Sequence, residues 1–397
     1  MATKKYGNGT YEGDMNAQGL EHGWGVYRWT ESGARYEGDW VQGKRTGTGT
    51  YYYPSGNVYV GEFLDGKLHG KGKITFASGA SYDGDWTNGD RTGKGVYKWP
   101  DGATYVGDFL KGAKHGKGKY TWDDGTWYDG DWKNDKRTGF GELFFFDSGD
   151  LYKGEFFEGE EHGTGKITYA DGGYYEGEWA HGNREGYGVM VLESGDKYEG
   201  FWKDGKFNGQ GKYSWLSTGS GYYEGNFVDD FFDGYGVRIW SNGDKFEGYW
   251  KGDKRNGAGK LTLATGAWYD GDWVNDNREG HGKYSWPSGD VYEGEWKDDK
   301  RTGEGVYVWP SGRKHKGGFV DGEIQGFGTS LYPSNEAYEG NWVDGVWEGE
   351  GIYVDADGNA YKGVWKDYKT SDSLVAIMKG ADAPVYGSML NGEWTEN

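Results

Sequence analysis

The chain has 397 residues, with 79 Gly, 22 Trp, 34 Tyr, 17 Phe, no Cys and a net charge of −20. The lack of cysteine excludes disulfides, thiolate zinc sites and cysteine nucleophiles, and the acidic balance argues against nucleic acid and anionic membrane lipid as partners. A glycine share far above the usual ~7% would indicate disorder, but aromatic residues make up 18% of the chain. Because each ring buries a large apolar area, the composition favours a folded protein rich in β-turns.

One motif recurs along the chain, with a spacing of 23 residues nearly everywhere. It reads YEGDW at residue 36, YVGEF at 59 and YDGDW at 82, and about sixteen copies run from an irregular one at Tyr11 to the last at Tyr361. We name each repeat by its leading residue and count positions from it. The pattern predicts an N-terminal cap strand over residues 1–10, a repeat array over 11–365 and a C-terminal capping or docking tail over 366–397.

Each repeat has the pattern of a β-hairpin. Residues 82–86 alternate Tyr, Gly and Trp with two Asp, which is the period-2 signature of a strand with two different faces. A turn follows at 88–90, a second alternating strand at 93–99, and another turn at 100–102. We therefore predict an all-β fold in which tandem hairpins form one elongated, twisted antiparallel sheet, advancing about 10 Å per repeat.

The two faces of this predicted sheet differ in chemistry. One carries Tyr, Trp and Gly, and we expect the glycines to leave a floor on which neighbouring rings lie. The other places Asp or Glu of the first strand across from Lys or Thr of the second, a favourable cross-strand pairing.

Arginine and tryptophan are linked in this repeat. Seven repeats carry Arg at position 10, and each of them also has Trp at position 5, whereas the five repeats with Phe at position 5 never have that Arg. The arginines are Arg45, Arg91, Arg137, Arg184, Arg255, Arg278 and Arg301. We expect the guanidinium to pack on an indole face; the alternative is a recent duplication of a two-repeat block.

The pattern Y-x-G-[DE]-[WF]-x-x-G-x-x-x-G-x-G resembles the MORN repeat, as in residues 59–63 followed by Gly66, Gly70 and Gly72. The resemblance covers residues 11 to about 365 and implies a MORN-repeat solenoid that organises other proteins. It implies a cytoplasmic scaffold of the cytoskeleton, with a ciliary or flagellar axoneme component of radial-spoke-head type as the specific expectation. The alternative is a membrane-associated organiser that binds phospholipid or tethers membrane to cytoskeleton, which the net charge of −20 disfavours.

Residues that break the pattern are the candidate protein-binding sites. Aromatic rings replace polar residues or stand at turns in the middle third of the chain, and exposed apolar rings on a polar surface mark partner contacts. The candidates are Phe144, Phe146, Phe157, Phe201, Phe207, Phe231, Phe232 and Tyr249. The alternative is that some of these rings fold inward.

No catalytic, cofactor or metal site is expected. Carboxylates recur with every repeat, whereas a catalytic pair occurs once. His69, His115 and His162 stand two repeats apart, about 20 Å, too far to share a metal, and turn residues are the better interpretation. The aliphatic run over 373–379 predicts a short helix or last strand that caps the sheet edge, with docking or homodimerisation through a terminal edge as the alternative.

Overall fold

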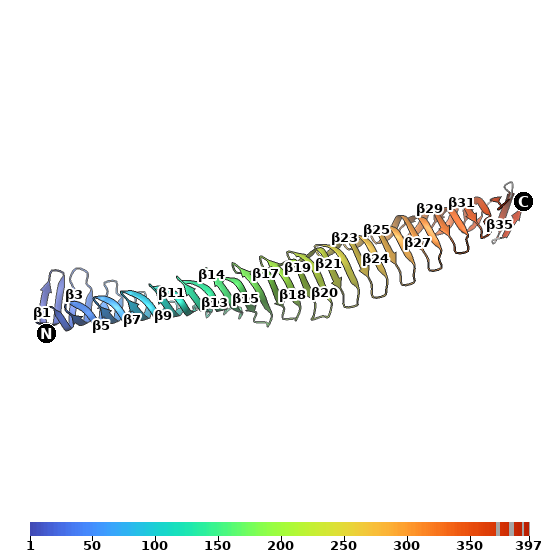
Figure 1. Ribbon diagram of the computed structural model, residues 1–397. Coiled ribbons are helices and arrows are strands. Elements are labelled where there is room, and N and C mark those ends of the chain that lie inside the picture. The colour runs from blue at the N-terminus through green and yellow to red at the C-terminus, as the bar shows by residue number, and fades with distance from the viewer. Residues whose placement is uncertain (371–373, 381–384, 391–392, 397) are drawn as a thin grey trace. The chain divides into compact units, whose positions relative to one another are not determined.

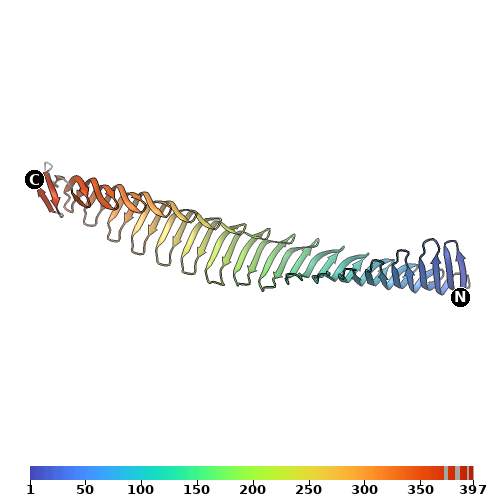
Figure 2. The same ribbon diagram turned by 180° about the vertical axis from the view of Figure 1, so that it is seen from behind.

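The computed structural model describes residues 1–370, 374–380, 385–390 and 393–396, and no helix forms in this part of the chain. The chain divides into two halves, residues 1–194 with 202–205, and residues 195–201 with 206–397. Each half consists of antiparallel hairpins that follow one another in chain order (Figure 1; seen from behind in Figure 2). The expectation of an all-β fold of tandem hairpins is confirmed in each half.

The strands of the N-terminal half alternate between seven and nine residues after a short first strand. They are β1 (Ala2–Tyr6), β2 (Gly9–Met15), β3 (Glu21–Trp29), β4 (Arg35–Val41), β5 (Lys44–Tyr52), β6 (Val58–Leu64), β7 (Lys67–Thr75), β8 (Ser81–Thr87), β9 (Asp90–Lys98), β10 (Thr104–Leu110), β11 (Ala113–Thr121), β12 (Trp127–Lys133), β13 (Lys136–Phe144), β14 (Leu151–Phe157), β15 (Glu160–Thr168), β16 (Tyr174–Ala180) and β17 (Asn183–Val191).

Strand β18 (Lys197–Lys203) contains residues of both halves, and the C-terminal half repeats the same construction. Its strands are β19 (Lys206–Ser214), β20 (Tyr222–Val228), β21 (Phe231–Ile239), β22 (Lys245–Lys251), β23 (Lys254–Thr262), β24 (Trp268–Val274), β25 (Asn277–Ser285), β26 (Val291–Lys297), β27 (Lys300–Val308), β28 (Lys314–Val320), β29 (Glu323–Leu331), β30 (Ala337–Val343), β31 (Val346–Val354), β32 (Ala360–Lys366), β33 (Lys369–Thr370), β34 (Leu374–Ile377), β35 (Val385–Leu390) and β36 (Glu393–Glu396).

From the Tyr36 repeat to the Tyr361 repeat, the turn inside each hairpin has two residues with positive φ. In the Tyr82 repeat these are Asn88 at 54° and Gly89 at 96°, the signature of a type I′ turn, whose twist matches that of the flanking strands. Asn, Asp and Gly dominate these positions because they tolerate the left-handed conformation. The acidic turn pairs Asp229–Asp230 and Asp298–Asp299 belong to the same class.

The register is fixed by a pair of facing glycines. Gly84 lies opposite Gly95, and directly after Gly84 the register shifts by a β-bulge that brings Trp86 opposite Arg91. Because strand residues that face each other point to the same side of the sheet, positions 1, 3, 5, 10, 14, 16 and 18 share one side, which we call the aromatic face. Positions 2, 4, 13 and 15 form the other side, the charged face.

The C-terminal tail forms strands in the part that the structure describes. Leu374–Ile377 form β34, which pairs with β32 and with β35, so the aliphatic run continues the sheet as a strand. Of the predicted tail over 366–397, residues 371–373, 381–384, 391–392 and 397 lie outside the described residues. At the other end, β1 pairs with β2 from Ala2 to Tyr6.

Candidate interaction surfaces

The leading tyrosine of each repeat lies on a floor of glycine. Tyr82 is fully buried, and a Cβ added to Gly84 or Gly95 would lie within about 2.6 Å of its ring or hydroxyl. The Tyr82 hydroxyl donates to the carbonyl of Asp85 at 3.0 Å, and desolvation by burial raises the pKa of this phenol to about 12. The expectation that glycines make room for the rings is confirmed, and the paired glycines explain why the motif repeats them.

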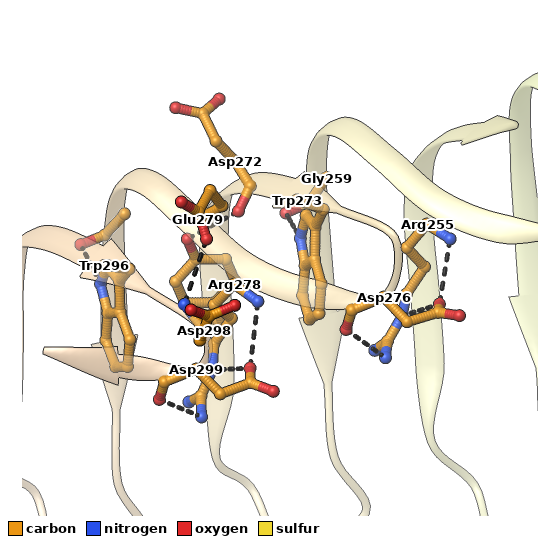
Figure 3. Close-up of polar contacts among 12 residues, drawn as sticks. Arg255, Gly259, Asp272, Trp273, Asp276, Arg278, Glu279, Trp296, Asp298 and Asp299 are labelled. Carbon is orange, nitrogen blue, oxygen red and sulfur yellow. Dashed lines mark hydrogen bonds and ion pairs between the residues drawn. The ribbon is translucent and has the colours of Figure 1, made fainter.

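The tryptophan at position 5 is tied to the preceding repeat. Trp86 Nε1 donates to the Gly72 carbonyl at 2.8 Å, and the indole packs edge-on against Tyr82, with ring centroids 5.3 Å apart. Trp273 and Trp296 donate in the same way, each at 3.0 Å, to glycine carbonyls one repeat earlier (Figure 3). The indole therefore points toward the preceding repeat.

The arginine at position 10 instead points toward the following repeat. Arg91 Nη2 donates to the Gly112 carbonyl at 2.7 Å, and its guanidinium lies 5.7 Å from the ring of Phe109, both in the following repeat. Figure 3 shows two successive bridges of this kind, from Arg255 to Asp276 and from Arg278 to Asp299.

The expected packing of Arg on an indole is found in three repeats, but the indole belongs to the following repeat: Arg184, Arg255 and Arg278 lie 4.5, 4.1 and 4.5 Å from Trp202, Trp273 and Trp296. Trp86 and Arg91 are register partners, as their linkage in the sequence suggested. However, the Nε1 hydrogen bond turns the indole toward the preceding repeat, so the ring that the guanidinium meets is the position 5 ring of the next one.

Two to four rings lie within about 6 Å of the cation at position 10, and we call their arrangement the aromatic slot. The guanidinium of Arg301 lies 5.6 Å from Trp286 at position 18 of the preceding repeat, 5.7 Å from Tyr292 and 5.2 Å from Tyr307 of its own repeat, and 5.7 Å from Phe319 of the next. Lys114 occupies the same place in the Tyr105 repeat, within 6.0 Å of four rings. The slot favours a cation because the ring faces are electron-rich.

Two of the predicted binding residues fill this slot. Phe207 stacks on Tyr198 with centroids 3.8 Å apart, and Phe232 stacks on Tyr223 at 3.7 Å, and both are half-buried. Their prediction as exposed rings was wrong, because a flat apolar ring replaces the flat guanidinium. The sequence could have predicted this inward position, because each Phe stands nine residues after its leading Tyr, as the arginines do.

The charged face carries a ladder of ion pairs. Lys94 Nζ lies 2.7 Å from Asp108 Oδ1 in the next repeat, and Lys117 makes the same contact with Asp131 at 2.7 Å. Asp108 also accepts a hydrogen bond from the Lys117 backbone N–H at 3.0 Å, which closes the β-bulge. The expected pairing of acids with Lys or Thr is confirmed, and the bulge contact is a second role that the sequence did not reveal.

Aromatic rings replace these charges at positions 4 and 13, which are register partners across neighbouring repeats and which we call the outer column. Of the predicted residues, Phe201 and Tyr249 lie there, and their side chains are about half exposed. Tyr249 packs edge-on against its register partner Tyr235, with centroids 5.6 Å apart.

The remaining predicted residues lie elsewhere. Phe146, Phe157 and Phe231 are exposed, at a turn or at the end of a strand. Phe144 is half-buried and stacks on Trp127 at 5.8 Å. These four rings do not belong to the outer column.

Sequence reasoning missed most rings of the outer column. In the N-terminal half they are Trp24, Phe140 and Tyr187, and in the C-terminal half Tyr235 and Phe327 join Phe201 and Tyr249. Phe327 and Phe140 have exposed fractions of 61% and 58%. Four of the missed rings stand at position 13, where Lys71, Lys94 and Lys117 stand in regular repeats, and Trp24 has the same pairing in the irregular first repeat.

The histidines lie in strands and not in turns, which corrects that expectation. His69, His115 and His162 belong to β7, β11 and β15, each opposite an acidic residue after the bulge. Within the described ranges, no three His, Cys, Asp or Glu side chains come close enough to hold a metal ion. No helix of these residues is long and apolar enough to cross a membrane.

Comparisons with known proteins agree with the repeat. The chain is 39% identical over 72 residues to alsin of Mus musculus, which covers 17% of the chain and 4% of alsin. It is 42% identical over 59 residues to MORN repeat-containing protein 3 of Xenopus laevis, covering 13% of the chain and 25% of that protein. The chain thus aligns with only a small share of these relatives.

Solved structures resemble the chain only distantly. The SAS-4 TCP domain of Drosophila melanogaster aligns at 16% identity and a TM-score of 0.25, covering 38% of this chain and 82% of that domain. The TCP10 domain of Danio rerio CPAP aligns at 12% identity and a TM-score of 0.19, covering 72% and 97%. TM-scores this low carry no functional argument.

The family model of the MORN repeat matches fourteen consecutive segments between residues 36 and 360. These segments begin at the leading residues of the structural hairpins, from Tyr36 to Tyr338. Arrays of this repeat are generally non-enzymatic scaffolds. The chain belongs to the MORN-repeat family.

Proposed function

We propose that this chain is a non-catalytic scaffold that binds protein partners through the outer column of its charged face. The observation that supports this most is the replacement of ion pairs by exposed rings at positions 4 and 13. In regular repeats these positions hold pairs such as Lys94 and Asp108, whereas Tyr235 and Tyr249 occupy them at about half exposure. Exposed aromatic side chains beside charges are typical of interface anchors.

The setting that we propose is a cytoskeletal assembly, with the ciliary axoneme as the specific case. This step rests on the resemblance of the repeat to axonemal and cytoskeletal scaffolds, and fold-level analogy is its warrant. The partners would be other proteins of a larger assembly, and the net charge of −20 disfavours nucleic acid and anionic lipid.

The experiment restores the regular ion pair in place of the rings. We expect Tyr235→Lys with Tyr249→Asp to keep the fold, because Lys94 and Asp108 occupy the same register positions. Affinity purification from the native source with mass spectrometry should lose at least one partner that wild type recovers. Val274→Lys, an exposed substitution at position 6 outside the column, is the matched control and should keep that partner.

An identical partner list for the double variant and the control would contradict the proposed surface. Flotation with anionic liposomes at physiological salt tests the membrane alternative. We expect no binding, and binding that survives physiological salt would favour the membrane organiser instead.

A further inference from the structure

The end of the repeat array breaks the rule that governs position 10. From the Tyr36 repeat to the His315 repeat, position 10 holds Arg, Lys or an apolar side chain in every repeat but one, where it is Glu161, and the next hairpin turn closes over it. The closing bond runs from a turn N–H to the position 10 carbonyl, as from Gly322 to Arg301 at 3.0 Å and from Gly345 to Ile324 at 3.0 Å. In the Tyr338 repeat Trp347 still fills the slot, stacked on Tyr338 with centroids 4.1 Å apart, but position 10 of the last repeat is the short Thr370.

The closing turn is also altered there. In the described part of the chain, the turn residue Tyr368 does not donate its N–H to the Trp347 carbonyl. Its hydroxyl instead donates to the Gly345 carbonyl at 2.6 Å, and its ring lies 5.3 Å from that of Trp347. The turn is therefore held by its side chain and not by the backbone bond of the other repeats.

Position 18 changes as well. It is aromatic or Leu in every repeat from Tyr36 to His315, but in the Tyr338 repeat it is Asp355. A carboxylate thus stands where a ring of the aromatic slot would lie around position 10 of the Tyr361 repeat. With Thr370 as a short side chain at that position, space remains.

The result is a cavity of about 570 Å³ on the aromatic face of the C-terminal half. Six rings line it, together with three carboxylates, Thr370 and one basic residue, Lys369. The rings are those of Tyr332, Trp347, Tyr353, Tyr361, Trp365 and Tyr368, and the carboxylates those of Glu336, Asp355 and Asp367. Its volume falls within the range of small-ligand pockets. Aromatic faces beside carboxylates provide the environment that a cation prefers.

Two of these carboxylates are held ionised by hydrogen bonds. Ser334 and Tyr353 donate to Glu336 and lower the pKa of its carboxyl. Burial opposes ionisation of Asp355, but hydrogen bonds from Asn359 and Tyr361 outweigh it and keep the pKa of this carboxyl below its usual value. Among the described residues, neither carboxylate forms an ion pair.

We propose that this cavity, the terminal slot, binds an arginine side chain of a partner protein. Seven repeats of the same chain hold a guanidinium between the rings of an aromatic slot, as Arg301 does at 5.2–5.7 Å. The terminal slot differs from these slots: of the four ring positions around position 10 of the Tyr361 repeat only Tyr361 remains, while other rings and carboxylates line the cavity and Thr370 replaces the cation. A planar guanidinium suits it better than an ammonium, because it stacks on rings while its N–H groups reach carboxylates.

The inference rests on the proposed scaffold function in one respect, since the arginine belongs to a partner. It concerns a different surface, because the outer column lies on the opposite face of the sheet. If arginine does not bind, the partner list of the Tyr235→Lys and Tyr249→Asp variant still tests the proposed scaffold surface. If that partner list is unchanged, the arginine titration still tests the terminal slot.

The test uses the full chain labelled with ¹⁵N-tryptophan and a capped arginine, N-acetyl-arginine-N-methylamide, as the probe. We expect saturable shifts of the indole signals of Trp347 and Trp365, assigned with Trp347→Phe. The lysine analogue should bind more weakly, and the uncharged citrulline analogue should give no saturable shift. Equal responses to the arginine and citrulline analogues would overturn the proposal.

Three variants separate the terminal slot from the rest of the surface. Asp355→Asn and Glu336→Gln should each weaken binding by about tenfold or more, because each removes a charge that faces the guanidinium. Asp83→Asn, an exposed carboxylate of the charged face, is the control and should bind as wild type does.

Thr370→Arg is the decisive variant, since it supplies the missing internal guanidinium. It should abolish binding of the probe and raise the unfolding temperature. Asp355 also accepts a hydrogen bond from Asn359 in the adjacent turn, so a loss of binding in Asp355→Asn has a second explanation, local unfolding. Thr370→Arg does not share this explanation, because its unfolding temperature should rise. Probe binding unchanged by Thr370→Arg would overturn the proposal.

Discussion

Arg91 donates a 2.7 Å hydrogen bond to the carbonyl of Gly112, which belongs to the next hairpin, and Gly112 returns a 2.9 Å bond from its own N–H to the Arg91 carbonyl. The two residues thus form a reciprocal clamp between successive repeats. Since a single hairpin cannot bury its aromatic face, such bonds between neighbours carry much of the stability of a repeat array.

Replacing the arginine of this clamp should destabilise the array. Arg91→Ala loses the hydrogen bond to Gly112 and the contacts with three rings, and we expect the free energy of unfolding to fall by about 2 kcal/mol. Arg91→Leu should lose less, because Leu68 fills the same position one repeat earlier. Urea denaturation followed by tryptophan fluorescence measures both, and an unchanged midpoint for Arg91→Ala would contradict the clamp.

The glycine floor should tolerate no side chain. In Gly84→Ala the new Cβ would lie 2.5 Å from the Tyr82 hydroxyl and 2.6 Å from Gly95 Cα, so the strands must separate. We expect a loss of about 1–3 kcal/mol, as for overpacked cores. Gly7→Ala is the control, since nothing lies within 4 Å of its Cβ. Equal thermal stability of the two variants would refute the packing argument.

The ion pairs of the charged face should stop stabilising the protein in acid. The hydrogen bond from Lys71 is the main cause that lowers the pKa of Asp85, with the Lys94 N–H adding to it, and burial opposes both. A carboxyl whose pKa is lower in the folded state stabilises fully above its unfolded pKa of about 3.9, and this stability is lost as pH falls through the folded pKa.

We therefore expect the unfolding temperature to drop as pH falls below about 4. Asp85→Asn should have a lower unfolding temperature at pH 7 and a smaller further drop in acid. A series of thermal melts from pH 7 to 2 checks this, and parallel curves for wild type and the variant would exclude a contribution from Asp85.

His315 should make the protein sensitive to a different pH range. It replaces the leading Tyr, is fully buried and contacts the Ser330 hydroxyl at 3.1 Å. Desolvation, with help from the nearby Arg313 charge, lowers the pKa of His315 to about 4. The unfolded chain binds a proton near pH 6.5 while the folded chain does not, so stability falls as pH drops from about 6.5 toward that value.

His315→Phe removes this titration, and Phe246 shows that a leading Phe fits the fold. We expect the difference in unfolding temperature, variant minus wild type, to increase as the pH is lowered from 7 to 5. A constant difference across that range would mean that His315 does not titrate on unfolding.

The repeat was readable from the sequence because its signals are local. Alternation of Tyr, Gly and Trp with Asp, and turn residues such as Asn88 and Gly89, specify a hairpin without reference to distant residues. The 23-residue spacing then specifies which strands meet, since each hairpin has only its neighbours to pair with. The two faces and the acid–lysine pairing followed from the same period.

Contacts between repeats depended on the tertiary structure. The sequence linked Trp86 with Arg91 but did not show that the indole leans back to Gly72 and the guanidinium forward to Gly112. The β-bulge after Gly84 shifts the register between these contacts, and its sequence signal is Gly93, a motif glycine inside a strand with a φ of 55°. The inward position of Phe207 was missed for the same reason, because the slot that holds it exists only between repeats.

The exceptions needed both kinds of information. Asp355 and Thr370 are ordinary residues in an acidic, polar chain, and only their places in the repeat make them unusual. The sequence by itself determined the hairpin, its period and its two faces, because these depend on neighbours along the chain. The tertiary structure decided which side chains the array buries, exposes or leaves room for, because those depend on packing between one hairpin and the next.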